Sequence, residues 1–183
     1  GGSQEIETAA YRELLDHIAQ SGLVDMIDVE VFKDFTYEEL AGDRTPEVQE
    51  RFENLKQWIE SLRQRVVVVG SYHNFDRTPE DAELKDRLQI IDESGVDIPK
   101  MAVMPANRLD VMRLMMFTLQ MAEQMDKPLI TMSMSRIGSI SRISGEAFGS
   151  AVTFGSIGQE SAPGQLPVNK LEEMLDMIHQ NYQ

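Results

Sequence analysis

Short apolar runs that alternate with longer amphipathic stretches are the feature that most restricts the fold of this chain. Five such runs are typical of buried strands, and they lie at residues 26–31, 66–70, 98–104, 128–134 and 150–154. The stretches between them repeat apolar residues every three or four positions, as helices that cover a sheet do. Helices are expected at residues 5–20, 47–63, 78–95, 107–125 and 167–181. This alternation predicts an α/β fold with a parallel sheet.

The ends of these elements carry local signals. Thr78-Pro79-Glu80-Asp81 offers an N-cap, a proline for the first turn and two acids, which predicts a helix start at Thr78. Residues 33–46 and 138–145 are rich in polar residues and glycine, so we expect loops there. No linker or repeat divides the chain, which predicts one domain over residues 1–183. Since a closed (β/α)8 barrel needs eight strands and about 250 residues, the pattern leaves two folds open: a small open sheet or an incomplete barrel.

Composition excludes several classes of function. The formal net charge of −14 disfavours binding to nucleic acid or to anionic lipid. The sequence has no cysteine, which removes thiolate chemistry and favours a cytoplasmic setting. The three histidines, His17, His73 and His179, lack the spacing of a metal site, and we expect no metal. No apolar run is long enough for a membrane span, so we expect no membrane partner.

Lys100 and His73 are the strongest candidates for chemistry, because each lies at or near the end of its own apolar run. Burial disfavours the charged form of an amine, and a neutral amine is the nucleophile that Schiff-base chemistry requires. A histidine at the carboxyl end of a neighbouring strand could move the proton. The alternative readings are a lysine whose ammonium reaches water and a histidine that only hydrogen-bonds the backbone.

Weaker candidates follow along the chain. Arg142 lies in the glycine- and serine-rich loop and could bind a carboxylate. Ser161 and Gln165 flank a Pro-Gly turn and could bind hydroxyl groups, whereas Met134 is expected in the core of a strand. Asp28 shares a strand face with Glu30; it could be catalytic, but pairing with an arginine is the more common role of such an acid.

Taken together, these segments resemble type I 3-dehydroquinate dehydratase, the lyase of the shikimate pathway. The resemblance covers nearly the whole chain and rests on residues 21–28, His73, Ile98-Pro99-Lys100, Met132-Ser133-Met134, Ile140-Ser141-Arg142, residues 145–150 and Ser161-Ala162-Pro163-Gly164-Gln165. It implies an eight-stranded TIM barrel, a dimer, a cytoplasmic enzyme of aromatic amino acid biosynthesis and no cofactor.

The resemblance also implies roles for the candidate residues. Lys100 would form the Schiff base with 3-dehydroquinate, and His73 would be the general acid and base. Arg142 would hold the substrate carboxylate, Ser161 and Gln165 would bind its polar groups, and Met134 would line the lysine pocket. Tyr72 and Asn74 depart from the residues that commonly flank this histidine.

The family's first three βα units have no counterpart in this sequence. We therefore expect an incomplete barrel of about five parallel strands, with low or no activity for the chain alone unless a second chain or segment completes it. A homodimer with strand exchange is one such route. Two other functions stay open at this point: a class I aldolase-like Schiff-base barrel, and a non-catalytic binding or folding fragment.

Overall fold

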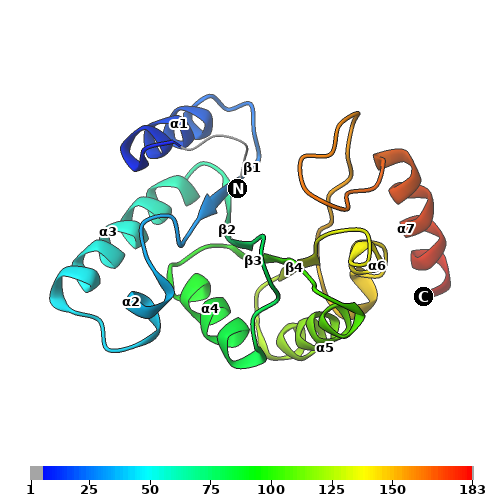
Figure 1. Cartoon of the computed structure of the whole chain (residues 1–183). Helices are drawn as coiled ribbons and strands as arrows, with labels where there is room; N and C mark the ends of the chain where they lie inside the picture. The colour runs from blue at the N-terminus through cyan, green and yellow to red at the C-terminus, as the bar shows by residue number, and fades with distance from the viewer. Residues whose placement is uncertain (1–5, 183) are drawn as a thin grey trace. The chain divides into compact units, whose positions relative to one another are not determined.

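A computed structural model of the chain, shown in Figure 1, describes residues 6–182. The fold divides into two compact units. Unit 1 comprises Gly1–Tyr72 and Ala82–Lys100, and unit 2 comprises His73–Asp81 and Met101–Gln183. The expectation of a single domain stays a prediction. No helix in residues 6–182 is long and apolar enough to cross a membrane.

Unit 1 is built on parallel strands with helices between them. Its strands are β1 (Met26–Glu30), most of β2 (Val67–Asn74) and the first half of β3 (Ile98–Val103); its helices are α1 (Thr8–Gln20), α2 (Tyr37–Ala41), α3 (Pro46–Arg63) and α4 (Asp81–Glu93). Strand β1 pairs in parallel with β2, with Met26 opposite Val67 and Glu30 opposite Ser71. Strand β3 follows β2 in the sheet, where the Asp97 amide donates to the Val68 carbonyl at 2.9 Å.

Helix α3 shows how the apolar pattern produces the core of unit 1. Its buried side chains recur at helical spacing: Val48, Phe52, Leu55, Ile59 and Leu62. Ile59, and not the neighbouring Trp58, lies on this buried face. Trp58 is half-buried instead, and its indole nitrogen donates to Asp16 of α1 at 2.9 Å. An indole has one polar atom that needs a partner, so the edge of a core suits it better than the centre.

Unit 2 continues the same alternation. It contains the rest of β3, α5 (Arg108–Gln124), β4 (Ile130–Ser133), α6 (Ser139–Ile143), the 3-10 helix η1 (Glu146–Phe148) and α7 (Val168–Tyr182). Strand β4 lies beside β3, where the Met134 amide donates to the Val103 carbonyl at 2.8 Å. Four strands therefore form the described sheet, in the order β1-β2-β3-β4.

The fifth predicted strand, residues 150–154, is wrong as a strand. It is reduced to one parallel bridge between Leu129 and Ser150. The Ser150 hydroxyl accepts a hydrogen bond from the Thr131 amide at 3.0 Å, a contact that holds the segment at one point. Beyond Ala151 the chain pairs with no strand in the described residues, and propensity without a partner strand does not make a sheet.

Other boundaries also differ from the sequence prediction. Helix α4 begins at Asp81 rather than Thr78, because the Thr78 hydroxyl donates to the Met104 carbonyl at 3.0 Å instead of capping a helix. The expected loop 33–46 contains α2, which starts with a capping box between Thr36 and Glu39. The expected loop 138–145 contains α6.

Candidate active site

Lys100 lies in the middle of β3, a strand whose six residues are all buried. Its side chain is only 9% exposed. The Lys100 ammonium nitrogen donates to Oδ2 of Asp28 on β1 at 2.5 Å. Because β2 lies between β1 and β3, this ion pair reaches across one strand on a single face of the sheet in unit 1.

The Asp28–Lys100 pair corrects one expectation. The sequence analysis expected Asp28 to pair with an arginine, and the partner is Lys100. The second oxygen of Asp28, Oδ1, is buried and accepts no hydrogen bond in the described part of the chain.

Tyr11 of α1 holds the backbone of β1 at the residues that surround Asp28. The Tyr11 hydroxyl donates to the Asp28 carbonyl at 3.3 Å and accepts from the Glu30 amide at 3.0 Å. Burial raises the pKa of Tyr11 to about 12, so the hydroxyl keeps its proton over the physiological range. The backbone of β1 is thus satisfied on the side that does not face β2.

His73 is the next-to-last residue of β2, which runs four residues further than the sequence predicted. Its ring stacks on the ring of Phe75, with centroids 6.0 Å apart and 12° between the planes. His73 opens unit 2, whereas Lys100 closes unit 1. The two catalytic candidates therefore belong to different units.

Arg142 is the most buried charged residue of unit 2, with 1% of its surface exposed. It lies in α6. Its Nη1 atom donates to the Met132 sulfur at 3.5 Å, and its Nη2 atom donates to the Pro163 carbonyl at 3.4 Å. Burial lowers the pKa of the guanidinium, and the Glu160 carboxylate partly offsets this. The Nε atom of Arg142 is buried and donates to no acceptor in the described residues. A buried guanidinium with so few acceptors is suited to bind an anion.

The turn from Ser161 to Gln165 is held against the end of β4. The Ser161 amide and hydroxyl both donate to Oε1 of Gln165, at 2.8 and 3.1 Å. The Ser135 amide donates to the Pro163 carbonyl at 3.1 Å, and Ser135 itself has a left-handed φ of 62°. Arg142 and Ser135, the residue after the buried Met134, therefore both donate to the Pro163 carbonyl of this turn. Four of the predicted residues, Met134, Arg142, Ser161 and Gln165, belong to this part of unit 2.

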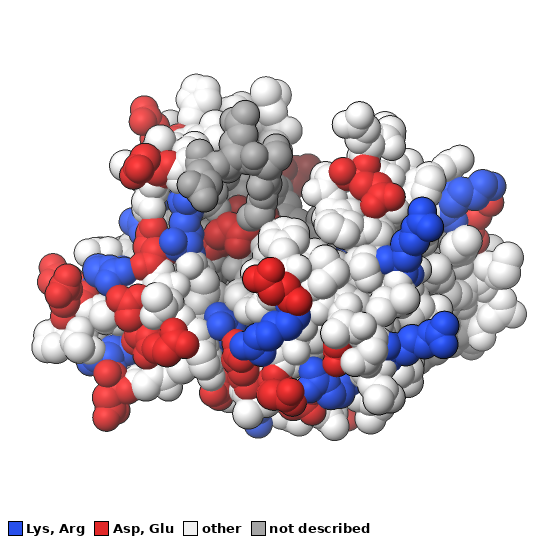
Figure 2. All heavy atoms as spheres, viewed as in Figure 1, with Lys and Arg blue, Asp and Glu red and all other residues white. Residues whose placement is uncertain are grey.

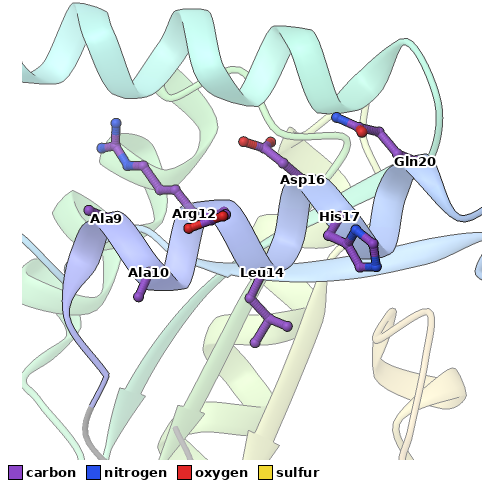
Figure 3. A pocket seen from close by; sticks show the side chains of 8 residues that line it. Ala9, Ala10, Arg12, Leu14, Asp16, His17 and Gln20 are labelled. Atoms are coloured by element: carbon purple, nitrogen blue, oxygen red, sulfur yellow. The ribbon is translucent and has the colours of Figure 1, made fainter.

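A large surface hollow belongs to unit 1. It has a volume of about 660 Å³, and its described lining residues all belong to α1, between Ala9 and Gln20. Figure 3 shows that Arg12 and Asp16 point toward α3, whereas Leu14 and His17 point away from it. No candidate site residue lines this hollow. Figure 2 shows acidic and basic side chains interspersed over the visible face. Residues 6–182 contain no cluster of three or more metal-ligating side chains.

Sequence reasoning missed Tyr11 and the contact of Arg142 with Pro163. No sequence pattern marks them, because the partners are separated by 17 or more residues. Asp28 was noticed, since a carboxylate on the inner face of a predicted strand needs a charged partner. The identity of that partner depends on which strands are neighbours.

Comparison with known proteins gives one family. Residues 1–182 match the family model described as type I 3-dehydroquinase. The 3-dehydroquinate dehydratase of Bacillus licheniformis is 41% identical over 183 residues, which are 99% of this chain and 65% of that protein. The chain thus spans about 65% of the length of this curated relative.

Solved structures agree with this match. The 3-dehydroquinate dehydratase of Geobacillus kaustophilus superimposes with a TM-score of 0.82 at 32% identity, over 100% of this chain and 65% of that one. The type I 3-dehydroquinate dehydratase of Clostridium difficile, solved with covalent modified comenic acid, gives a TM-score of 0.83 at 38% identity. The match covers 99% of this chain and 65% of that one. The four parallel strands and their helices therefore correspond to part of a TIM barrel.

Proposed function

Because the chain belongs to the type I 3-dehydroquinase family, we propose that it is a carbon–oxygen lyase that removes water from 3-dehydroquinate to give 3-dehydroshikimate. The observation that carries this proposal is the buried Lys100 amine on β3, held by Asp28 at 2.5 Å. An amine in such a place is suited to covalent catalysis on a ketone. The Clostridium difficile relative, with its covalent modified comenic acid, supports a covalent step in this family.

Lys100 supplies the nucleophile in the proposed reaction. The neutral amine attacks the ketone carbon, the carbonyl oxygen leaves as water, and an iminium forms between the substrate and Lys100. The iminium withdraws electrons from the neighbouring carbon, which makes its proton easier to remove. After elimination, one water hydrolyses the product imine and restores the amine.

His73 moves the proton in this proposal. It takes the proton from the carbon next to the iminium and returns it to the departing hydroxyl, so that water leaves. The position of His73 near the carboxyl end of β2 supports the assignment, because the residues that act in α/β barrels lie at these strand ends. Its stacking on Phe75 restricts the rotation of the imidazole ring.

Arg142 and the turn from Ser161 to Gln165 are proposed to hold the substrate. The buried Nε of Arg142 gives the guanidinium a donor for the carboxylate of 3-dehydroquinate. The Ser161–Gln165 hydrogen bonds shape the turn for binding polar groups, and Met134 is proposed to line the pocket of the iminium. Holding the carboxylate would fix the proton within reach of a base.

Borohydride trapping tests the proposal. The purified chain is incubated with 3-dehydroquinate, reduced with borohydride and examined by intact mass and peptide mapping. A reduced adduct on Lys100 is expected, and Lys100→Ala should abolish it. His73→Ala should retain the adduct but lose turnover, because it removes proton transfer and leaves the amine. A folded chain that gives no adduct would contradict the proposal.

We also infer a homodimer that works in the cytoplasm. Leu109, Met112 and Met116 form an exposed apolar stripe along α5, which supports association through this helix. The cysteine-free sequence favours a reducing compartment. Light scattering of the purified chain tests the dimer, and a monomer at micromolar concentration would contradict it.

A further inference from the structure

We propose that Asp28 is the counter-ion of the reactive lysine: it fixes the Lys100 nitrogen in place and balances the positive charge on that nitrogen while the Schiff base forms and breaks. This role rests on the proposed function and deepens it. The structure supports it through the ion pair, the way Asp28 is held, and the unused oxygen of its carboxylate.

The ion pair joins two distant parts of unit 1. Asp28 and Lys100 are 72 residues apart, and their Oδ2 and Nζ atoms are 2.5 Å apart. The lysine side chain is 9% exposed and that of Asp28 is 39% exposed. A cation this deeply buried is costly unless it has a charged partner. Asp28, whose side chain is less buried than that of Lys100, provides that partner.

The backbone prevents Asp28 from turning away. Ile27 and Val29 are buried on the opposite face of β1, so alternation along the strand fixes the direction of the Asp28 side chain. On the other edge of β1, the hydroxyl of Tyr11 bonds the backbone at Asp28 and Glu30. The carboxylate is thus placed by strand pairing and by the half-buried Tyr11.

The second carboxylate oxygen of Asp28 supports a catalytic role in addition to a structural ion pair. Oδ2 is bonded to Lys100, whereas Oδ1 is buried and accepts no hydrogen bond in the described residues. A buried carboxylate oxygen without a donor is costly in a purely structural role. It would be satisfied by a transient donor, such as the hydroxyl of the tetrahedral carbinolamine that precedes the iminium.

The proposed steps balance in atoms and charge. Asp28 accepts one proton from the Lys100 ammonium, which leaves a neutral amine and a carboxylic acid. The amine attacks the ketone, and a second amine proton neutralises the alkoxide to give the carbinolamine. Asp28 then gives its proton to the carbinolamine hydroxyl, which departs as water. The carboxylate that remains is the counter-ion of the iminium, and hydrolysis runs the same steps in reverse.

The first experiment measures the reactivity of Lys100 without any substrate. Acetic anhydride is applied in trace amounts, and the labelling rate of Lys100 is determined by peptide mass relative to other lysines of the same chain. In Asp28→Asn the carboxylate that holds the Lys100 nitrogen is lost, so labelling of Lys100 should rise roughly tenfold. Asp25→Asn is the matched control, since Asp25 is exposed just before β1 and the charge change is identical. Equal labelling of Lys100 in the two variants would overturn the proposal.

The second experiment follows the catalytic step. Borohydride trapping measures the rate at which the adduct with 3-dehydroquinate forms. This rate should fall by roughly tenfold to a hundredfold in Asp28→Asn and stay unchanged in Asp25→Asn. In Asp28→Ala, added formate should restore part of the rate, whereas chloride at the same ionic strength should not. A purely structural ion pair would show neither the selective loss nor the rescue by formate, and that result would reject the catalytic role.

The two proposals fail in different ways. A wild-type chain that forms no adduct contradicts the proposed function, while the labelling experiment still decides whether Asp28 controls Lys100. An adduct that forms equally fast in wild type and folded Asp28→Asn contradicts only the role of Asp28. Circular dichroism establishes that the variants fold. If no variant folds, the wild-type chain is treated with a carbodiimide, which couples a carboxylate to a neighbouring amine. An amide between Asp28 and Lys100 is expected, and its absence would contradict the ion pair.

Discussion

Three polar side chains, the buried Lys100 and Arg142 and the half-buried Tyr11, account for most of the local chemistry. Each has a different partner: a carboxylate for Lys100, a sulfur and a carbonyl for Arg142, and backbone groups for Tyr11. The energetic rule is the same for all three, because a buried polar group without a partner costs more than its hydrogen bond contributes. Arg142 keeps one buried nitrogen without an acceptor, which makes it the residue whose substitution is most informative for binding.

We expect Arg142→Lys to raise the KM for 3-dehydroquinate by roughly tenfold to a hundredfold, because a lysine cannot reproduce the planar fork that binds a carboxylate. The Schiff base with a small neutral ketone should be unaffected, since no carboxylate is involved. Steady-state kinetics and borohydride trapping measure the two effects. Arg136→Lys is the control, because Arg136 is exposed. An unchanged KM would show that Arg142 does not bind the carboxylate.

Tyr11→Phe should lower the free energy of unfolding at pH 7 by about 0.5–1.5 kcal/mol, the net value of lost hydrogen bonds. The pKa of Tyr11 is raised to about 12 in the folded chain, so its contribution is complete below its ordinary value of about 10. The contribution is lost as pH rises from about 10 to 12, because the unfolded chain ionises first. Urea unfolding of both proteins should therefore give a difference that shrinks over this range. A constant difference would contradict the assignment.

At the scale of elements, the apolar pattern predicted the helices well, whereas the polar signals predicted the ends of elements less reliably. The long helices lie where they were predicted, because their buried faces repeat every three or four residues. The predicted start at Thr78 failed because a tertiary contact with Met104 competes for the same hydroxyl. The glycine-rich loop around Arg142 became a short helix. Local signals of this kind depend on which distant groups are available as partners.

The turn at Gly164 gives a test of element packing. Gly164 has a left-handed φ of 80°, and a β-carbon there would strike the backbone of Ser135. Gly158 has a similar φ of 85° with nothing near an added β-carbon. Both alanine variants incur the cost of a left-handed alanine, about 1 kcal/mol, but only Gly164→Ala adds the clash, which should cost a further 1–3 kcal/mol or so. Thermal unfolding measures both, and equal losses would mean that the turn does not pack as described.

At the scale of the whole molecule, charge is the property that matters for an anionic substrate. The net charge of −14 repels a carboxylate, and in the proposed reaction Arg142 would attract it against that field. Salt screens the long-range repulsion more than it screens a buried pair. The charge of the chain thus affects the approach of the substrate, while the site residues determine how it is held.

Raising the ionic strength from about 10 to 150 mM should therefore increase the rate of adduct formation with 3-dehydroquinate by roughly twofold to threefold, because the Debye length falls from about 30 to 8 Å. A neutral ketone should react at a rate that does not depend on salt. Trapping at several salt concentrations measures both. A rate with 3-dehydroquinate that falls with salt would show that local attraction dominates instead.

The sequence by itself determined the class of the fold, the family and the residues that carry the proposed chemistry. The periodicity of strands and helices depends on residues that are close in the sequence. The motifs around His73, Lys100 and Arg142 are also continuous in the chain. The tertiary structure alone decided that Lys100 pairs with Asp28, that Tyr11 holds β1, and that residues 150–154 form one bridge instead of a strand. The physical reason is that each of these depends on a partner far along the chain, and only folding determines which partners meet.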